Sequence, residues 1–349
     1  MKVRAAKTKP NGLDGKAPTL KAVAARVGLT AGTVSAVLNN SDASRSVPEH
    51  TRKRILAAAA ALDYRPNHLA RSLRVKRTNT IGVIAVEIGD AYGSVLISGI
   101  EKYLRQQNFF FLTVAHRHDK QLLDTYSRLL MQRGVEGFIS IDTQITEAPL
   151  PTVAIAGHGH LAGVTNVVLD QRRAAELALR HLVELGHREI AFMKGSSFSS
   201  DADSRWNAVC RVARDLGLTM HPELIVQLEG FDPTPRLGYP AGKKLLAQKK
   251  PFSALFAYND ISALGAVNAF QEAGLHVPDD VSVVGLDDSE IAIHYSPSLT
   301  TVRQPLLKMG EVAARVLLER LEGSSENPAE ILIEPELVIR KSTAAVGSR

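Results

Sequence analysis

Few stretches of this chain have residue types and spacings that could serve catalytic or cofactor chemistry. Residues 157–162 match G-x-G-x-x-A after a predicted strand, which is the pattern of a dinucleotide-binding loop. That loop needs a following helix, whose N-terminus holds the pyrophosphate. Here residues 163–170, GVTNVVLD, follow and are typical of a strand. We therefore expect no nucleotide cofactor.

Histidines form the other chemical candidates. His116 and His118 stand beside Asp119, and His158 lies two residues from His160. A closed zinc site needs four ligands in a tetrahedral arrangement, and no matching partner cluster accompanies either pair. We expect solvated loop histidines and no metal. The chain also lacks G-x-S-x-G, a P-loop and H-E-x-x-H, so an enzyme hypothesis has no catalytic residue to name.

Residues 19–40, TLKAVAARVGLTAGTVSAVLNN, predict two short helices separated by a tight turn. Thr19 and Thr30 are good N-caps, and apolar residues recur at i, i+3, i+4 and i+7 in the first helix. Gly28 supplies the positive φ that ends a helix at low cost. This spacing predicts a helix-turn-helix, whose second helix enters the major groove of DNA. A purely structural helical hairpin is the alternative.

The charge distribution favours the DNA-binding interpretation. Residues 1–77 hold 16 Lys and Arg against 4 Asp and Glu, whereas residues 78–349 hold 26 against 32. The excess positive charge therefore lies beside the helix-turn-helix and predicts a polyanionic partner for that end alone.

Compartment is predicted from cysteine usage and hydropathy. Cys210 is the single cysteine, so an intrachain disulfide is excluded and a reducing cytoplasm is the simplest location. The N-terminus is basic but has no apolar signal region, and no apolar run reaches membrane-spanning length. We expect a cytoplasmic protein with no membrane partner.

Hydrophobic patterning divides the chain into five parts. They are a disordered basic arm (1–17), a helical headpiece (18–66), a basic linker or hinge helix (67–77), an α/β core (78–343) and a tail (344–349). In the core, apolar strands alternate with amphipathic helices, which implies parallel sheets with right-handed crossovers. Two successive α/β sets predict two Rossmann-like lobes, at about 78–182 with 304–333 and 183–303 with 334–343, with a cleft between them.

These motifs together resemble the lactose/galactose repressor (LacI/GalR) family. T-L-x-x-V-A-x-x-x-G-L-T-x-x-T-V-S-x-V-L-N resembles its headpiece and N-x-x-A-R-S-L its hinge, while YNDISALG and GLDD resemble core landmarks. The resemblance extends from about Thr19 to Thr343. It implies a periplasmic-binding-protein-like core and a homodimeric regulator that binds a pseudo-palindromic operator in double-stranded DNA. A small effector in the cleft would control that binding.

The resemblance implies a set of DNA-binding residues. By position these are Thr19, Leu20, Thr30, Ala31, Gly32, Thr33, Ser35, Ala36, Asn39, Tyr64, Asn67, Ala70, Leu73 and Arg74. Leu73 matches a leucine that wedges between base pairs in the minor groove, and Arg74 matches its flanking contact. The family's groove-reading positions fall on Ala31, Gly32 and Ala36, of which the last is commonly Arg. We therefore expect weak direct readout of bases, with specificity carried by the Leu73 kink and DNA shape.

The resemblance also implies effector-binding residues in the cleft. They are Asp90, Tyr92, Asp170, Arg205, Asn259 and Asp287. Arginine is a multiple donor and aspartate an acceptor, so together they can bracket the hydroxyls of a sugar, and Tyr92 can stack on an apolar ring face. A sugar-like effector is favoured and a nucleobase remains open. We expect the effector to weaken DNA binding, with corepression as the alternative. A periplasmic binding protein is the rival interpretation, but it would need a signal peptide and would not carry residues 19–77.

Overall fold

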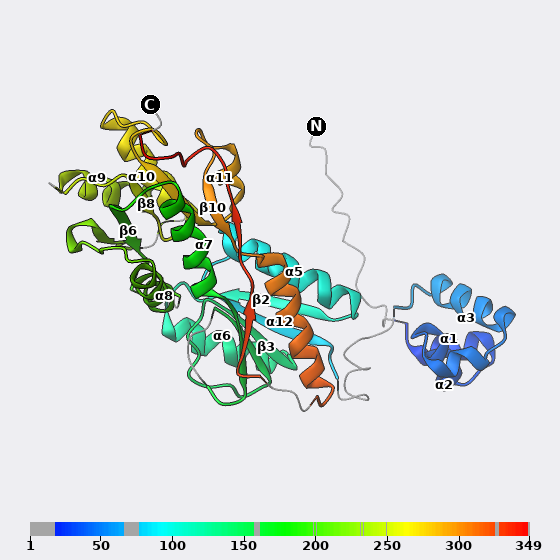
Figure 1. The fold of residues 1–349 in the computed structure, drawn as a ribbon. Helices are drawn as coiled ribbons and strands as arrows, with labels where there is room; N and C mark the ends of the chain where they lie inside the picture. The colour runs from blue at the N-terminus through cyan, green and yellow to red at the C-terminus, as the bar shows by residue number, and fades with distance from the viewer. Residues whose placement is uncertain are drawn as a thin grey trace, which may run out of the picture. The chain divides into compact units, whose positions relative to one another are not determined.

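The computed structural model describes residues 18–65, 77–156, 161–197, 199, 201–230, 232, 234–248, 250–324 and 328–347. The chain forms two compact units, Met1–Thr78 and Asn79–Arg349 (Figure 1). We call the first unit the headpiece and the second the core. Each unit has its own apolar interior.

The headpiece is a small helical unit. Its elements are α1 (Leu20–Val27), α2 (Ala31–Leu38), a short 3-10 helix η1 (Asp42–Ser46) and α3 (Glu49–Ala61). The side chains of Thr19 and Thr30 cap α1 and α2, each accepting a backbone N–H at 3.2 Å. Gly28 lies between the two helices with φ 67°, a conformation that a β-carbon disfavours. The axes of α1 and α2 differ by 107°, as a helix-turn-helix requires.

One lobe of the core, lobe 1, is built on a fully parallel sheet in the order β11-β5-β4-β3-β1-β2. Its strands are β1 (Thr80–Ala85), β2 (Phe110–Ala115), β3 (Gly137–Ile141), β4 (Thr152–Ile155), β5 (Val164–Leu169) and β11 (Glu330–Ile333). Its helices are α5 (Ala91–Gln106), α6 (Lys120–Gln132) and α12 (Leu306–Leu321). Strands β3, β4 and β5 are buried throughout, as the continuous apolar runs predict.

Lobe 2 repeats this plan, with the strand order β12-β10-β9-β8-β6-β7. Its strands are β6 (Ile190–Lys194), β7 (Ile225–Gln227), β8 (Ala254–Phe256), β9 (Ser282–Asp287), β10 (Thr300–Arg303) and β12 (Glu336–Val338). Its helices are α7 (Gln171–Glu184), α8 (Ala202–Asp215), η2 (Pro222–Leu224), η3 (Pro235–Leu237), α9 (Tyr239–Ala247), α10 (Asp260–Glu272) and α11 (Glu290–His294). Only β12 runs antiparallel to its neighbour.

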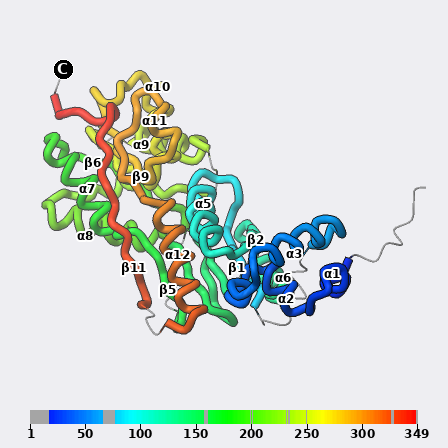
Figure 2. The backbone as a smooth tube through the Cα atoms, turned by 90° about the vertical axis from the view of Figure 1, so that its right-hand side faces the viewer, coloured from blue at the N-terminus to red at the C-terminus, as the bar shows by residue number. Residues whose placement is uncertain are grey.

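The described chain passes between the lobes at three points. These lie between β5 and α7, between β10 and α12, and between β11 and β12. Figures 1 and 2 show the last segment running from one lobe into the other. Each lobe is therefore assembled from stretches that are far apart in the sequence.

The chain crosses from lobe 1 to lobe 2 earlier in the sequence than we predicted. We expected lobe 1 to extend to residue 182, which would include α7. Instead the buried face of α7, from Ala174 to Leu182, packs with α8 and with Phe192 and Phe256 of the lobe 2 strands. The amphipathic pattern of α7 shows that one face is buried, but it does not say which sheet that face covers.

Two glycines bring α5 and α12 together beside the cleft. A β-carbon on Gly99 would lie 2.1 Å from the carbonyl oxygen of Leu307, and one on Gly310 would lie 2.2 Å from that of Leu96. This close approach packs the middle of α5 against the N-terminal part of α12, and the first turns of both helices contribute residues to the cleft. Among the described residues, no single helix has the length and apolar character needed to cross a bilayer.

Candidate functional site

The polar side chains at the two ends of α2, the second helix of the helix-turn-helix, form hydrogen bonds mainly with one another. The hydroxyls of Thr30 and Thr33 lie 2.9 Å apart at the start of α2. At the end of α2, Asn39 donates from Nδ2 to the Ser35 carbonyl at 2.8 Å and to its hydroxyl at 3.2 Å. Ser35 is buried, whereas Thr30 is exposed. The hydroxyls at the N-terminal end of α2 are therefore the ones that solvent and phosphates can reach.

The other predicted DNA contacts are placed less favourably for reading bases. Leu20 and Tyr64 pack against the apolar cluster of the headpiece, together with Ala31. Gly32 is exposed and Ala36 is half-buried, and neither has a side-chain donor or acceptor. The predicted residues Asn67, Ala70, Leu73 and Arg74 lie outside the described residues.

The core contains a cleft of about 910 Å³ between its two lobes. Asp90 and Tyr92 line it from lobe 1, and Arg205, Asn259 and Asp287 line it from lobe 2. All five follow the C-terminal ends of strands, or lie on the helices that begin there, which is where open α/β sheets collect ligands. The structure thus brings together five of the six predicted effector residues.

Asp170 is the exception, because it is not among the described residues that line the cleft. Its carboxylate instead accepts the backbone N–H of Arg173 at 2.9 Å and caps α7. An aspartate between a strand and a helix suits a ligand site and a helix N-cap equally well, and here the helix uses it.

Arg205 is the buried cation of the cleft, with 7% of its surface exposed. Its Nη1 donates to the Tyr258 carbonyl at 2.7 Å, its Nε to Gln171 at 3.1 Å and its Nη2 to Asp201 at 3.4 Å. The guanidinium also stacks 4.5 Å from the centre of the Tyr258 ring. Each of its three nitrogens is thus bonded to the protein, which fixes the group at the cleft wall.

Asp287 has a strongly altered acidity. Burial raises its pKa to about 8, against the opposing effect of Arg205 and with a further increase from the nearby charge of Asp260. The side chain of Gln304 donates from Nε2 to Asp287 at 2.5 Å. Such a carboxyl changes protonation near neutral pH, which makes it a candidate for ligand contact.

Two buried polar atoms in the cleft have no hydrogen-bond partner among the described residues. They are the hydroxyl of Tyr92 and the Oε1 atom of Gln304. Burial raises the pKa of Tyr92 well above its usual range, assisted by the charge of Asp201, so the phenol stays protonated. Unpartnered buried polar groups are costly, and a bound ligand is one means of satisfying them.

Two predicted residues also organise the helices that begin at the cleft. The carboxylate of Asp90 accepts the Gly93 N–H at 2.9 Å and caps α5. Asn259 forms a capping box with Ser262 at the start of α10. Both helices therefore direct their N-terminal ends towards the cleft.

Several other residues that line the cleft were not predicted from the sequence. Asp142 and Asp201 follow or precede ordinary-looking elements, and Tyr258 contributes a backbone carbonyl that no side-chain pattern reveals. Gln304 lies in a crossover segment. A polar residue directly after an apolar strand was the available signal for Asp142 and Tyr258.

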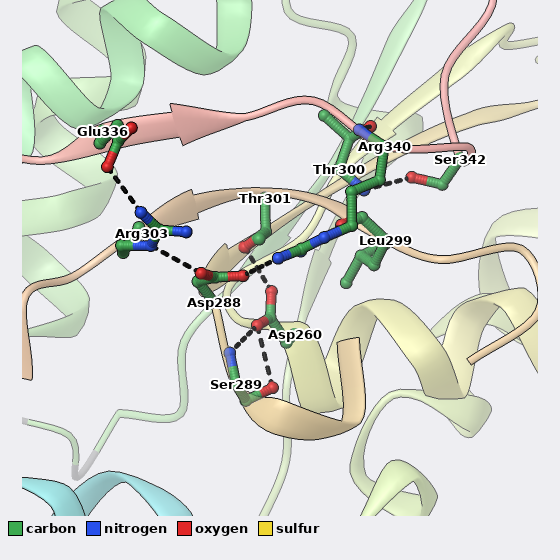
Figure 3. Close-up of polar contacts among 10 residues, drawn as sticks. All are labelled: Asp260, Asp288, Ser289, Leu299, Thr300, Thr301, Arg303, Glu336, Arg340 and Ser342. Carbon is green, nitrogen blue, oxygen red and sulfur yellow. Dashed lines mark hydrogen bonds and ion pairs between the residues drawn. The ribbon is translucent and has the colours of Figure 1, made fainter. Parts of the chain in front are cut away.

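Asp288 lines the cleft and is held by two arginines (Figure 3). Its side chain is 8% exposed and accepts from Arg303 Nε at 2.7 Å and from Arg340 Nη2 at 2.5 Å. Arg303 also donates from Nη1 to Glu336 at 2.7 Å. Because Arg303 ends β10 and Glu336 begins β12, the cluster joins β9 to both strands at points where the chain passes between the lobes.

Asp260 anchors the loop on the other side of Asp288. Its fully buried carboxylate accepts the N–H and hydroxyl of Ser289 at 2.7 and 2.9 Å, and the hydroxyl of Thr301 at 2.5 Å (Figure 3). Burial raises the pKa of Asp260 to about 6, although these hydrogen bonds act in the opposite direction. The loop that carries Asp287 is therefore fixed from both ends.

Two protein families match parts of the two units. Residues 19–67 match the bacterial regulatory proteins of the lacI family, and residues 179–343 match the periplasmic binding protein-like domain.

Sequence relatives extend over almost the whole chain. The HTH-type transcriptional repressor PurR of Haemophilus influenzae is 33% identical over 94% of this chain and 99% of its own length. The protein of the same name from Pasteurella multocida is 32% identical over 93% of this chain and 98% of its own length.

Solved structures of similar shape are also found. The lac repressor dimer bound to operator and the anti-inducer ONPF has a TM-score of 0.84 and 27% identity, over 95% of this chain and all of that one. The transcriptional regulator CelR in complex with cellobiose has a TM-score of 0.69 and 28% identity, over 93% of this chain and 99% of that one.

A helix-turn-helix joined to a two-lobed core with a polar cleft defines a DNA-binding regulator that responds to a small molecule. The chain belongs to the LacI family of bacterial regulatory proteins. It is a DNA-binding transcriptional repressor with an effector-binding core of the periplasmic-binding-protein type, and not an enzyme.

Proposed function

We propose that the chain represses transcription as a homodimer on a pseudo-palindromic operator, and that a sugar-like molecule in the cleft releases it from DNA. A nucleobase is the second candidate for the effector. The cleft is the observation that carries this proposal. Asp90, Tyr92, Arg205, Asn259 and Asp287 share one cavity of about 910 Å³, a size typical of small-molecule sites.

The way in which the chain connects the lobes supports coupling between cleft and DNA. Three passages join the lobes, so a ligand that contacts both lobes changes the angle between them. We infer that this movement alters the spacing of the two hinge segments, residues 67–77, in a dimer. The folding of these hinge segments on DNA would then be the two-state change that effector and DNA both influence.

An exposed apolar edge supports the proposed dimer. Phe110 and Leu112 on the edge strand β2 are 72% and 41% exposed. An exposed apolar edge strand is a typical site of association. The variant Phe110→Lys should shift the sedimentation coefficient towards that of a monomer. Its neighbour Phe109 packs against the lobe 1 core and is therefore not used as a control position. Lys120→Glu, on the exposed start of α6, supplies a matched surface control.

The test of the whole proposal uses full-length protein and DNA. An operator is first selected from random duplexes, and its affinity is then measured by fluorescence anisotropy at two salt concentrations, with sugars and nucleobases added in turn. We expect salt-dependent binding that one class of compound weakens. Binding that a compound strengthens would indicate corepression. Failure to retain any duplex at low salt would contradict the proposal. We place this activity in the cytoplasm, where operator DNA lies.

A further inference from the structure

The described side chains that line the cleft carry an excess of negative charge. Eight of these described residues are aspartate or glutamate, of which Asp287 is mostly protonated at neutral pH, and three are arginine or lysine. Carboxylates that line a cleft with low-dielectric walls produce a strong negative electrostatic potential in it, and this potential repels anions. The charge of the lining therefore bears directly on which effectors can enter.

Two of the three cations are already bound by carboxylates. Arg205 pairs with Asp201 at 3.4 Å, and its other nitrogens bond to protein acceptors. Arg303 bonds to Asp288 and to Glu336, each at 2.7 Å. The positive charge of both arginines is therefore already balanced by carboxylates, so an incoming phosphate or carboxylate would add a further negative charge beside Asp201 and Asp288.

Lys308 is the third cation, and its position differs from that of the other two. It is exposed in the first turn of α12. A hydrated surface ammonium contributes little to binding, because solvent and salt screen its charge. Lys308 alone does not offset the carboxylates that surround the ligand.

The hydrogen-bonding groups left open in the cleft favour the same class of ligand. Gln304 is 4% exposed, and its Oε1 atom, an acceptor, has no partner among the described residues. It stands next to Asp287, whose pKa of about 8 leaves this carboxyl mostly protonated at neutral pH. A ligand that satisfies the Oε1 atom of Gln304 must donate a hydrogen bond, as a hydroxyl or an amine does.

We propose that the effector is a donor-rich small molecule with no net negative charge, such as an unphosphorylated sugar or its amine derivative, and that the cleft excludes phosphate and carboxylate derivatives. The inference rests on the proposed function, since it concerns the same cleft. It goes further by naming the charge class of the ligand and the residues that impose it.

The test compares matched compounds on full-length protein. Thermal unfolding and calorimetric titration are performed with ribose against ribose 5-phosphate, glucose and glucosamine against glucose 6-phosphate and gluconate, and adenosine against AMP. Inorganic phosphate is compared with chloride at equal ionic strength. In any pair that binds, we expect the anionic member to bind at least about tenfold more weakly, a difference of about 1.4 kcal/mol. Asp287→Asn should reduce that ratio at pH 9, where Asp287 is ionised, and change it little at pH 6.

Two results would overturn the inference while leaving the sensor role intact. One is an anionic compound that binds more tightly than its neutral partner. The other is saturable stabilisation by inorganic phosphate that disappears in Arg205→Gln or Lys308→Ala, since phosphate held by the basic headpiece would persist in both variants. If no organic compound binds, the proposed sugar or nucleobase effector is contradicted, and the phosphate comparison still decides the charge of the cleft.

Discussion

The Nε atom of Arg303 lies 2.7 Å from a carboxylate oxygen of Asp288, and the neighbouring residues Gln304 and Asp287 bond to each other at 2.5 Å. Two consecutive residues at the end of β9 thus hold two consecutive residues at the end of β10. Both aspartates have positive φ, 120° and 59°, a conformation that costs about 1–3 kcal/mol per residue outside glycine. These bonds place Asp287 in direct contact with the segment that leads from β10 into lobe 1.

Replacing Asp288 should weaken the core substantially. In Asp288→Asn, two arginines lose their carboxylate, and Arg340 is only 13% exposed. We expect the free energy of unfolding to fall by about 3 kcal/mol, as for other buried pairs from which one partner is removed. Urea denaturation followed by circular dichroism measures this change. Glu336→Gln is the matched control, because Glu336 is 67% exposed and its loss should change stability by less than about 1 kcal/mol. Equal effects in both variants would contradict the assignment.

The raised pKa of Asp287 predicts a specific dependence of stability on pH. Because its pKa is about 8 in the folded core and near 4 in an unfolded chain, the folded state binds the extra proton between these values. The protonated carboxyl therefore makes its full contribution to the free energy of unfolding below about pH 4. That contribution is lost as the pH rises to about 8. Asp287→Asn should remove this loss and be more stable than wild type at pH 8 by several kcal/mol, since each unit of pKa shift corresponds to about 1.4 kcal/mol.

Other groups titrate in the same interval, so the difference between variant and wild type is the useful quantity. His116 is buried and bonded to Thr143, so our expectation of a solvated histidine is wrong for this residue. Burial lowers the pKa of His116 and His187, which makes stability rise with pH below about 6.5. Urea midpoints at pH 5, 6, 7 and 8 measure both curves. The exposed Asp124→Asn provides a control that should run parallel to wild type. A constant difference across these pH values would refute the assignment.

Leu73→Ala should separate specific from non-specific DNA binding. The family resemblance makes Leu73 the residue that wedges into the minor groove, and such a wedge contributes only where the duplex kinks. We expect at least about a tenfold loss of affinity for the selected operator and little change for random duplex, since phosphate contacts supply the latter. Anisotropy titrations with both duplexes give the two constants. An equal loss on both would rule out the wedge.

Direct readout of guanine by α2 should be weak. Ala31, Gly32 and Ala36 carry no donor, and Ser35 is buried and bonded to Asn39. Operators selected from random DNA should therefore show their strongest preference at the centre, where DNA shape matters, instead of at guanines beneath α2. Footprinting with guanine-specific chemistry locates any such contact. Strong protection of guanine by the helix would contradict the prediction.

Local signals in the sequence were sufficient for much of this architecture. The caps Thr19 and Thr30 and the alternation of apolar strands with helices are properties of neighbouring residues, and they predicted the helix-turn-helix and the two-lobed core. Five cleft residues followed from the family resemblance. The packing partner of α7 and the use of Asp170 as a cap could not be predicted, because both depend on which of two sheets the chain joins next.

The arrangement around Asp288 shows a similar limit. Its partners Arg303 and Arg340 lie 15 and 52 residues away in the sequence. Glu336 joins the cluster through its bond to Arg303. No periodicity relates them, and charged residues on strand ends are usually solvated. Only the fold brings them into one network.

The discontinuity of the lobes has a consequence for synthesis on the ribosome. Strand β11 completes the sheet of lobe 1 and β12 that of lobe 2, and both lie beyond residue 329. The headpiece, by contrast, is one continuous stretch that emerges first and can fold early. A chain interrupted before β11 would retain the DNA-binding headpiece, but each lobe would lack one strand of its sheet. Premature termination in this gene should therefore yield fragments that no metabolite can regulate.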